Sequence, residues 1–507
     1  MKISLLVKKY LHYGLLIVVV LAMILLVVSI IKSAYYYQYD YDELYHVQRT
    51  YLIASGLKPY TSFYFIYTSI FQKILMPFFS IFGFSFATLG KVRIFMVLIF
   101  AVRVVLTALL INKIFNRRAA LLFLPLFLFD PITIFSSMQI RPDNLMMIVY
   151  ILGLLVFITG FLKSTKLLLF LSGSIFGLSF LILLKIAPQL VILFIIYGIY
   201  CVLNREFKNF ILFIDGFILA LVLFFLYHIF DGSFIPMFKQ VFIIPFALPN
   251  ALINKTYYGF FYQPDNGFIY GLMEKPLTWY YVWILPLLAS AGAYLVLPNF
   301  SDNQQKKLTN IDKKKLLIKI FLIVSLVVQY MFLLKLDTVF IQYYIPFQWL
   351  LALFSAVMID DLIFKKFKSG FFHKLIKGGF IILFIILVYV SIQANNARTV
   401  FRSEYENKLA PIWSQVPPNA AIFPSILFRP IAFPLSIGDD QLNYNNNFWS
   451  VKDMFSSYVD SFEKNKLPYM LIDEPTKIYA LEPGLEKYIK DHYQKIDNQI
   501  NLYKRVK

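Results

Sequence analysis

The stretch that decides the fold runs from residue 11 to residue 49, with LHYGLLIVVVLAMILLVVSII at 11–31 followed by KSAYYYQYDYDELYHVQR at 32–49. The first part lacks Asp, Glu, Lys and Arg, and it has the length of about 20 residues that an α-helix needs to cross a bilayer. The second part becomes acidic and aromatic where such a helix would leave the membrane. Carboxylates at a membrane edge are costly, so this junction indicates a membrane span followed by a functional segment.

The rest of the chain repeats the apolar pattern. Hydrophobic residues make up 59% of the 507 residues, and the mean hydropathy is +0.68. We predict spans at residues 11–31, 93–111, 121–135, 144–161, 167–184, 188–203, 210–228, 279–297, 316–334, 340–362 and 378–393. Residues 63–82 are also apolar, but Gln72, Lys73 and Pro77 interrupt them, and we expect this stretch to lie in the interface. The predicted fold class is a polytopic α-helical membrane protein with about eleven transmembrane helices.

The net charge of +20 is compatible with a nucleic-acid partner or with a membrane topology signal. From Arg398 onward there are 14 Lys and Arg against 13 Asp and Glu, so the excess lies in the apolar part. Basic residues gather there in the short turns between alternate spans, which follows the positive-inside rule. We predict membrane lipids as partners, no nucleic acid, a cytoplasmic (inner or plasma) membrane location and an N-terminus on the inside. The only cysteine, Cys201, argues against disulfides and thiol catalysis.

The chain changes character near residue 395. We predict a transmembrane domain at 1–394, with outer loops at 32–91 and 231–278, and an extracytoplasmic α/β domain at 395–507. In the second domain the patterns predict strands at 420–423, 468–472 and 499–506 and helices at 451–463 and 484–492. About 110 residues are enough to build a separate hydrophobic core.

Asp42, His46 and Arg49 would share one face of a helix that begins near Asp42, because they are spaced at i, i+4 and i+7. The acid would then lie beside two cations, which suits a general base or a ligand for a hard metal ion. An ordinary solvated helix with charge pairs has the same pattern.

Further isolated charges fall on the same predicted face, namely Arg141, Asp143, Lys185, His228 and Asp231. Each has a structural explanation, since an acid can begin a helix, a cation can reach lipid head groups and a histidine can be interfacial. The sequence has no Gly-rich phosphate loop for a nucleotide sugar. The outer-face cations favour a substrate carried in the lipid with a phosphate head group.

The layout of these residues resembles the GT-C superfamily of polyprenyl-phosphate-dependent glycosyltransferases, in particular its protein O-mannosyltransferase and lipid A aminoarabinose transferase branch. The similarity rests on four features: Asp42-Glu43 in the first outer loop followed by GLKPY at 56–60, Arg141-Pro142-Asp143 in the second outer turn, the span end at 177–185, and the C-terminal outer domain. The resemblance implies that Asp42 is the catalytic base and that Glu43 supports it or helps to bind a metal. It also implies that Arg141 and Lys185 bind the donor phosphate, with His46, Arg49 and Asp143 in supporting positions.

By this resemblance the reaction is an inverting transfer from a polyprenyl-phosphate-linked sugar donor to a hydroxyl of a protein, lipid or glycan. A divalent metal ion at Glu43 and His228 is the one cofactor that the hypothesis includes. A polysaccharide polymerase or ligase, or a lipid-linked sugar transporter, stays open as the alternative. A transporter should place charges at the bilayer midplane, where Arg103 is the main exception to an apolar sequence.

Overall fold

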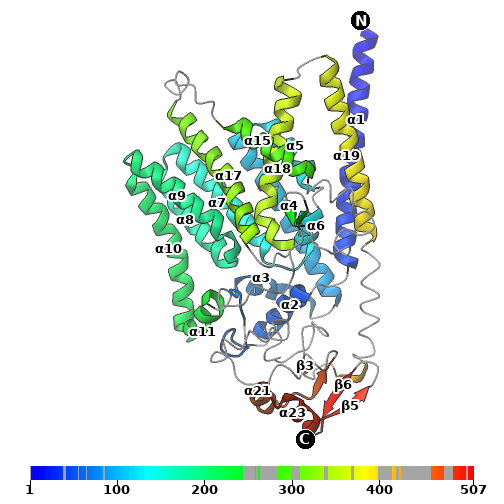
Figure 1. Ribbon diagram of the computed structural model, residues 1–507, viewed down its shortest axis with the longest axis vertical. Coiled ribbons are helices and arrows are strands. Elements are labelled where there is room, and N and C mark those ends of the chain that lie inside the picture. The colour runs from blue at the N-terminus through cyan, green and yellow to red at the C-terminus, as the bar shows by residue number, and fades with distance from the viewer. Residues whose placement is uncertain are drawn as a thin grey trace.

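A computed structural model describes residues 2–37, 41–54, 56–63, 65–83, 86–128, 131–243, 257–258, 261–262, 283–297, 309–335, 341–366, 370–397, 414–417, 422–423, 458–472, 483–497 and 501–506. Most of the predicted outer loop at 231–278 lies outside these ranges, as do residues 451–457 of a predicted helix. The molecule has three layers: a bundle of long helices, a layer of short helices at one end of it, and a small sheet beyond that layer (Figure 1). The two chain ends lie at opposite ends of the molecule.

The bundle contains α1 (Lys2–Tyr36), α4 (Phe86–Ile114), α5 (Arg117–Leu128), α6 (Pro131–Met138), α7 (Asp143–Lys163), α8 (Lys166–Ile182), α9 (Ala187–Leu203), α10 (Phe207–Phe230), α15 (Leu285–Val296), α17 (Asn310–Lys335), α18 (Ile345–Asp361) and α19 (Phe371–Ala397). Within the described ranges, seven helical stretches are long and apolar enough to cross a membrane. Each predicted span overlaps a helix of the bundle, which confirms the fold class. One prediction needs correction, because the span at 121–135 consists of two helices, α5 and α6.

Close helix contacts in the bundle are made at glycines. A Cβ on Gly173 of α8 would lie 1.9 Å from the carbonyl oxygen of Phe213 on α10. A Cβ on Gly216 of α10 would lie 2.0 Å from the carbonyl oxygen of Phe170 on α8. The two helices therefore cross backbone against backbone, as small residues allow in membrane bundles. α15 meets α18 in the same way at Gly292.

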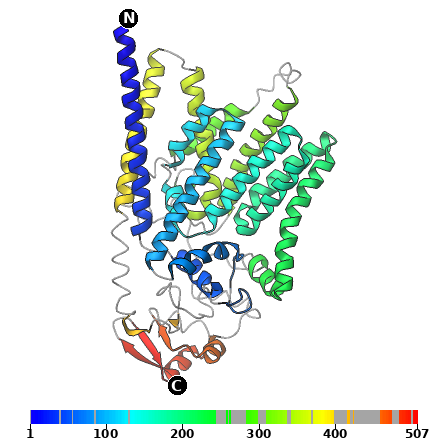
Figure 2. The same ribbon diagram turned by 180° about the vertical axis from the view of Figure 1, so that it is seen from behind.

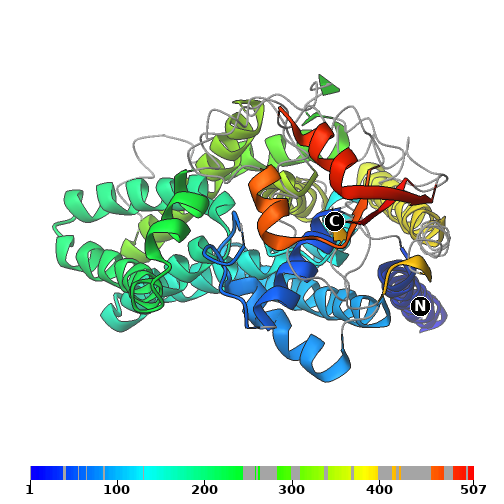
Figure 3. The same cartoon turned by 90° about the horizontal axis from the view of Figure 1, so that it is seen from below.

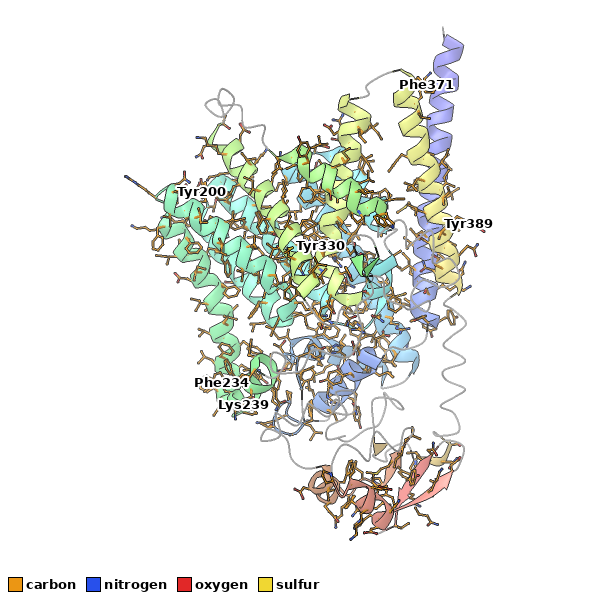
Figure 4. All side chains as sticks on the ribbon, in the orientation of Figure 1. Tyr200, Phe234, Lys239, Tyr330, Phe371 and Tyr389 are labelled. Atoms are coloured by element: carbon orange, nitrogen blue, oxygen red, sulfur yellow. The ribbon has the colours of Figure 1, made fainter. Side chains whose placement is uncertain are left out.

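The layer at the end of the bundle is made by described parts of the two predicted outer loops, 32–91 and 231–278. It contains α2 (Tyr41–Ala54), α3 (Ile70–Phe82), α11 (Phe234–Phe238) and the π-helical turn η2 (Lys239–Ile243). α3 has 13 residues, too few to cross a bilayer, and it buries Phe71, Leu75 and Phe79. The view from behind shows α2 and α3 between the bundle and the sheet (Figure 2), and Figure 4 places Phe234 and Lys239 at the same end. The stretch at 63–82 thus contains a helix too short for a span, at the end of the bundle, and its position in the membrane interface stays a prediction.

The C-terminal part forms a four-stranded sheet in the order β3-β4-β6-β5, with α21 (Tyr458–Asn465) and α23 (Leu485–His492) beside it (Figure 3). The strands are β3 (Ile422–Phe423), β4 (Tyr469–Leu471), β5 (Tyr493–Asp497) and β6 (Leu502–Arg505). β3 pairs parallel to β4, and the other two pairs are antiparallel. A core that includes Phe462, Met470, Leu485 and Ile489 joins helices to sheet. β5 was not predicted, because this edge strand has mostly exposed polar residues and no alternating pattern.

The remaining short elements are one pair of strands and three helical turns. The two-residue strands β1 (Tyr257–Tyr258) and β2 (Phe261–Tyr262) pair antiparallel within the predicted outer loop at 231–278. Two 3₁₀ turns, η1 (Leu184–Ile186) and η5 (Ile341–Tyr344), lead directly into α9 and α18, and the π-helical turn η6 (Leu362–Lys366) follows α18.

Candidate active site

Asp42 and Arg141 form an ion pair across the end of the bundle. Asp42 lies in the first turn of α2, and Arg141 lies in the turn between α6 and α7. The contact joins Asp42 Oδ2 to Arg141 Nη1. The Arg141 side chain is 7% exposed, whereas that of Asp42 keeps 35% of its surface open. The carboxylate is therefore held by a buried cation and still faces the exterior.

A second acid–cation pair lies beside the first. Lys185 Nζ is 3.1 Å from Asp143 Oδ1, and the Asp143 side chain is almost completely buried. The same ammonium group lies 4.4 Å from the centre of the Tyr343 ring, a cation–π arrangement. Three separate segments of the chain thus meet at Lys185: the start of α7, the turn η1 and the turn η5.

The positive ends of three helices converge at these pairs. α7 begins at Asp143, α9 begins two residues after Lys185, and α18 begins two residues after Tyr343. The first N–H groups of a helix have no partner inside the helix and carry a partial positive charge, so such ends favour anions. Two cations and three helix N-termini at one place make a setting in which a phosphate is readily bound.

Glu43 has surroundings that differ from those predicted. Its side chain is completely buried, and Arg93 of α4 binds both of its oxygens, with Nε donating to Oε1 at 2.7 Å and Nη2 donating to Oε2. The backbone N–H of Ile140 donates to Oε1 as well, at 2.9 Å. A carboxylate held this way is directed into the protein, away from the face that Asp42 presents.

His46 and Arg49 also depart from the predicted arrangement beside Asp42. Gln72 Nε2 lies 2.8 Å from His46 Nδ1, which accepts because an amide nitrogen can only donate. Burial, together with the positive charges of Arg141, Lys185 and Arg49, holds the pKa of His46 well below its ordinary value of 6.5. His46 is therefore a neutral buried residue at neutral pH. The Arg49 guanidinium lies 4.5 Å from the centre of the Tyr45 ring and donates to Gln48.

His228 joins the first predicted outer loop to the end of α10. Its Nδ1 is 2.8 Å from Ser233 Oγ, and its ring lies edge to face with Tyr60, 5.3 Å between centres. Gln240 binds the same loop, donating to the Tyr60 carbonyl and accepting from the Phe65 N–H, both at 2.9 Å. Nearby, the hydrogen bond from Lys58 lowers the pKa of Asp231, with which it forms an ion pair of 2.8 Å.

These contacts do not fit the predicted metal ion. Both oxygens of Glu43 accept hydrogen bonds from Arg93, and His228 packs against Tyr60 and Ser233. Within the described ranges, no group of three or more His, Cys, Asp or Glu side chains is gathered as metal ligands would be. No step of the reaction is therefore assigned to a metal.

Sequence reasoning missed Arg93 and Tyr343 as parts of this site. Arg93 was taken as the first residue of a span, although an arginine in an apolar helix is itself a signal. Tyr343 had no signal, since tyrosines are common at membrane interfaces. Arg103, noted in the sequence as a mid-span charge, donates to Asn144 Oδ1 and to the Ile345 carbonyl, both at 3.0 Å. It joins α4 to the starts of α7 and α18.

Comparison with known proteins gives a match at the level of structure. No family model matches the sequence, and no curated protein does. The structure is similar to that of ArnT from Cupriavidus metallidurans bound to undecaprenyl phosphate, with a TM-score of 0.57 and 14% identity over 97% of each chain. The apo state of ArnT gives a TM-score of 0.58.

A second solved structure is also similar in fold. It is the oligosaccharyltransferase AglB from Archaeoglobus fulgidus in complex with an inhibitory peptide and a dolichol-phosphate. The TM-score is 0.51 at 11% identity, over 96% of this chain and 74% of AglB. At such low identity the similarity establishes the fold and leaves the activity to be argued from the site. The chain therefore shares the fold of ArnT and AglB, which agrees with the fold expected from the resemblance of its predicted outer-loop residues.

Proposed function

We propose that this protein is a membrane glycosyltransferase that moves a sugar from a polyprenyl-phosphate donor to an acceptor hydroxyl on the extracytoplasmic face, with inversion at the anomeric carbon. The observation that carries the proposal is the Asp42–Arg141 ion pair beside Lys185, where three helix N-termini converge. The similar structures of ArnT and AglB were determined with undecaprenyl phosphate and dolichol-phosphate, which are lipid phosphates of the kind expected here.

Arg141 and Lys185 would bind the phosphate of the donor, with the helix N-termini adding to the positive potential. In the structure each cation is neutralised by a carboxylate, so the four side chains together carry no net formal charge. Arginine has five N–H donors in a fork and can bind a carboxylate and a phosphate at once. The donor phosphate could therefore bind while Asp42 keeps its place.

Asp42 would act as the general base. Its carboxylate accepts the proton of the acceptor hydroxyl while that oxygen attacks the anomeric carbon from the side opposite the phosphate. The bond between the anomeric carbon and the phosphate oxygen breaks, and polyprenyl phosphate leaves with the electron pair. Arg141 and Lys185 neutralise the charge that develops on the leaving group, which reduces the need for a general acid.

The proposal is tested by measuring sugar transfer by the purified protein with a panel of polyprenyl-phosphate sugars, with and without a chelator. Asp42→Asn keeps the size of the side chain and removes the base, so we expect a loss of turnover of at least 100-fold in a folded, membrane-inserted protein. Asp231→Asn is the matched control, because this acid lies at the same end of the bundle and pairs with Lys58 at the surface. Transfer by Asp42→Asn at the wild-type rate would exclude Asp42 as the base.

A further inference from the structure

We propose that Glu43 and Arg93 form a positioning device that sets Asp42 against Arg141, and that Glu43 binds neither substrate nor metal. The inference rests on the proposed function for its link to turnover, although the geometry is independent of it. Asp42 and Glu43 are neighbours on α2, and successive residues of an α-helix point about 100° apart. One acid therefore faces the exterior with 35% of its side chain exposed, and the other is completely buried.

The buried acid links the same two segments as the exposed one. Glu43 Oε1 accepts from the N–H of Ile140, and Asp42 Oδ2 pairs with Arg141, the next residue. Two adjacent residues of α2 are thus joined to two adjacent residues of the turn before α7. The backbone of Ile140 cannot move away from Glu43 without breaking a buried hydrogen bond. This bond therefore also limits the distance between the neighbouring residues Asp42 and Arg141.

Arg93 extends the device to a third and a fourth segment. Besides binding Glu43, its Nη1 donates to the carbonyls of Ala34 at 3.3 Å and Tyr37 at 2.6 Å, at the end of α1. The last carbonyls of a helix have no partner inside it and favour a cation, so this guanidinium is well matched to its place. The end of α1, the start of α2, α4 and the turn before α7 are therefore held by one buried pair.

A buried pair of this kind is rigid because each of its hydrogen bonds is directional and shielded from water. Loss of one member leaves the other charged and unpaired in the interior, which is strongly destabilising, while removal of both is tolerated better. A displacement of about 1 Å at a catalytic group can lower turnover about 100-fold. The device thus predicts that changes at Glu43 affect turnover through the position of Asp42.

The test uses Glu43→Gln, which keeps an oxygen for the Ile140 N–H and removes the charge. A second variant, Glu43→Gln/Arg93→Met, removes both charges and serves if the first folds poorly. We expect kcat to fall about 10- to 100-fold, while the Kd for polyprenyl phosphate stays within about threefold of wild type. Asp360→Asn is the matched control, since Asp360 is a buried acid paired with Arg118 and Asn116 in another part of the bundle, and it should lose stability without losing kcat.

A kcat equal to that of wild type in a folded Glu43 variant would overturn the inference. The inference would also be overturned if the kcat of the wild type depended on a divalent metal and the kcat of Glu43→Gln did not, because Glu43 would then be a metal ligand. An experimental structure of the double variant gives a readout without turnover, in which the Asp42 and Arg141 side chains should have separated. An unchanged pair would overturn the inference even if the proposed function holds, and a separated pair would support it even if no donor is used.

Discussion

Asp42 and Glu43 are adjacent acids, and their different surroundings indicate different roles. The sequence singled out both, because carboxylates are costly at a membrane edge. It placed them together in the site, since a sequence pattern does not say which side of a helix faces the interior. The structure separates them: Arg141 pairs with the first, and Arg93 with Ile140 holds the second. His46, one turn further along α2, is the third residue whose role follows from burial.

The pH dependence of stability should report on His46. Its pKa in the folded protein is held well below 6.5 by burial and by nearby positive charge, whereas in the unfolded chain it takes a proton near pH 6.5. The unfolded state therefore binds more protons in acid, and stability is lost as the pH falls below about 6.5, by up to about 1.4 kcal/mol per pH unit. We expect the melting temperature in detergent to fall between pH 7.5 and pH 5.5, and to fall less in His46→Gln. Equal falls in both proteins would contradict this role.

At the level of elements, the site depends on three helices that begin at one place. α7, α9 and α18 are distant along the chain, and the contacts of Lys185 with Asp143 and Tyr343 bring their first turns together. Sequence patterns predicted that helices would begin near these positions. They could not predict that the helix ends would adjoin, because that depends on how the bundle packs.

Arg141→Ala tests whether the place where these helices begin binds the donor phosphate. Loss of a charge-assisted hydrogen bond of about 1.5–3 kcal/mol should weaken binding of polyprenyl phosphate about 10- to 100-fold. The KM for the acceptor should change less than about threefold, because Arg141 is assigned to the donor. Arg118→Ala is the control, since this half-exposed arginine pairs with Asp360 away from the site. A defect confined to the acceptor would reverse the assignment.

The crossing of α8 and α10 gives a test of packing. In Gly216→Ala the new Cβ would lie 2.0 Å from the Phe170 carbonyl oxygen, so the two helices must move apart. Forced overpacking of this kind costs about 1–3 kcal/mol, and the melting temperature in detergent should fall. Gly378→Ala on α19 is the matched control, because no heavy atom lies within 4 Å of the added Cβ and alanine favours a helix. A variant at Gly216 as stable as wild type would show that the crossing is looser than described.

At the level of the whole molecule, the site lies between the helical bundle and the C-terminal sheet. The short helices α2 and α3 form the layer between them (Figure 1), so one end of the bundle carries all of the proposed machinery. The division into domains at 1–394 and 395–507 stays a prediction, as does the placing of this end outside the cytoplasm. Both follow from composition and from the positive-inside rule.

Thiol labelling can test the orientation directly. Cys201 is the only cysteine and is buried, so Cys201→Ser provides a background without thiols. In that background we expect Lys487→Cys, in the C-terminal sheet domain, to react with a membrane-impermeant maleimide in intact cells or spheroplasts. Lys208→Cys, in the first turn of α10, should react only after the membrane is permeabilised. Both lysines are exposed. The reverse pattern would place the site on the cytoplasmic side.

The sequence alone determined the membrane class, the approximate positions of most helices of the bundle, and Asp42, Arg141, Asp143 and Lys185 as candidate site residues. Hydropathy and isolated charge are local properties, so they can be identified in the sequence without knowledge of tertiary contacts. Only the tertiary structure decided that Asp42 pairs with Arg141, that Glu43 is buried on Arg93, and that His46 is shielded and neutral. The physical reason is that pairing and burial depend on which helices pack together, and the partners here come from segments far apart in the chain.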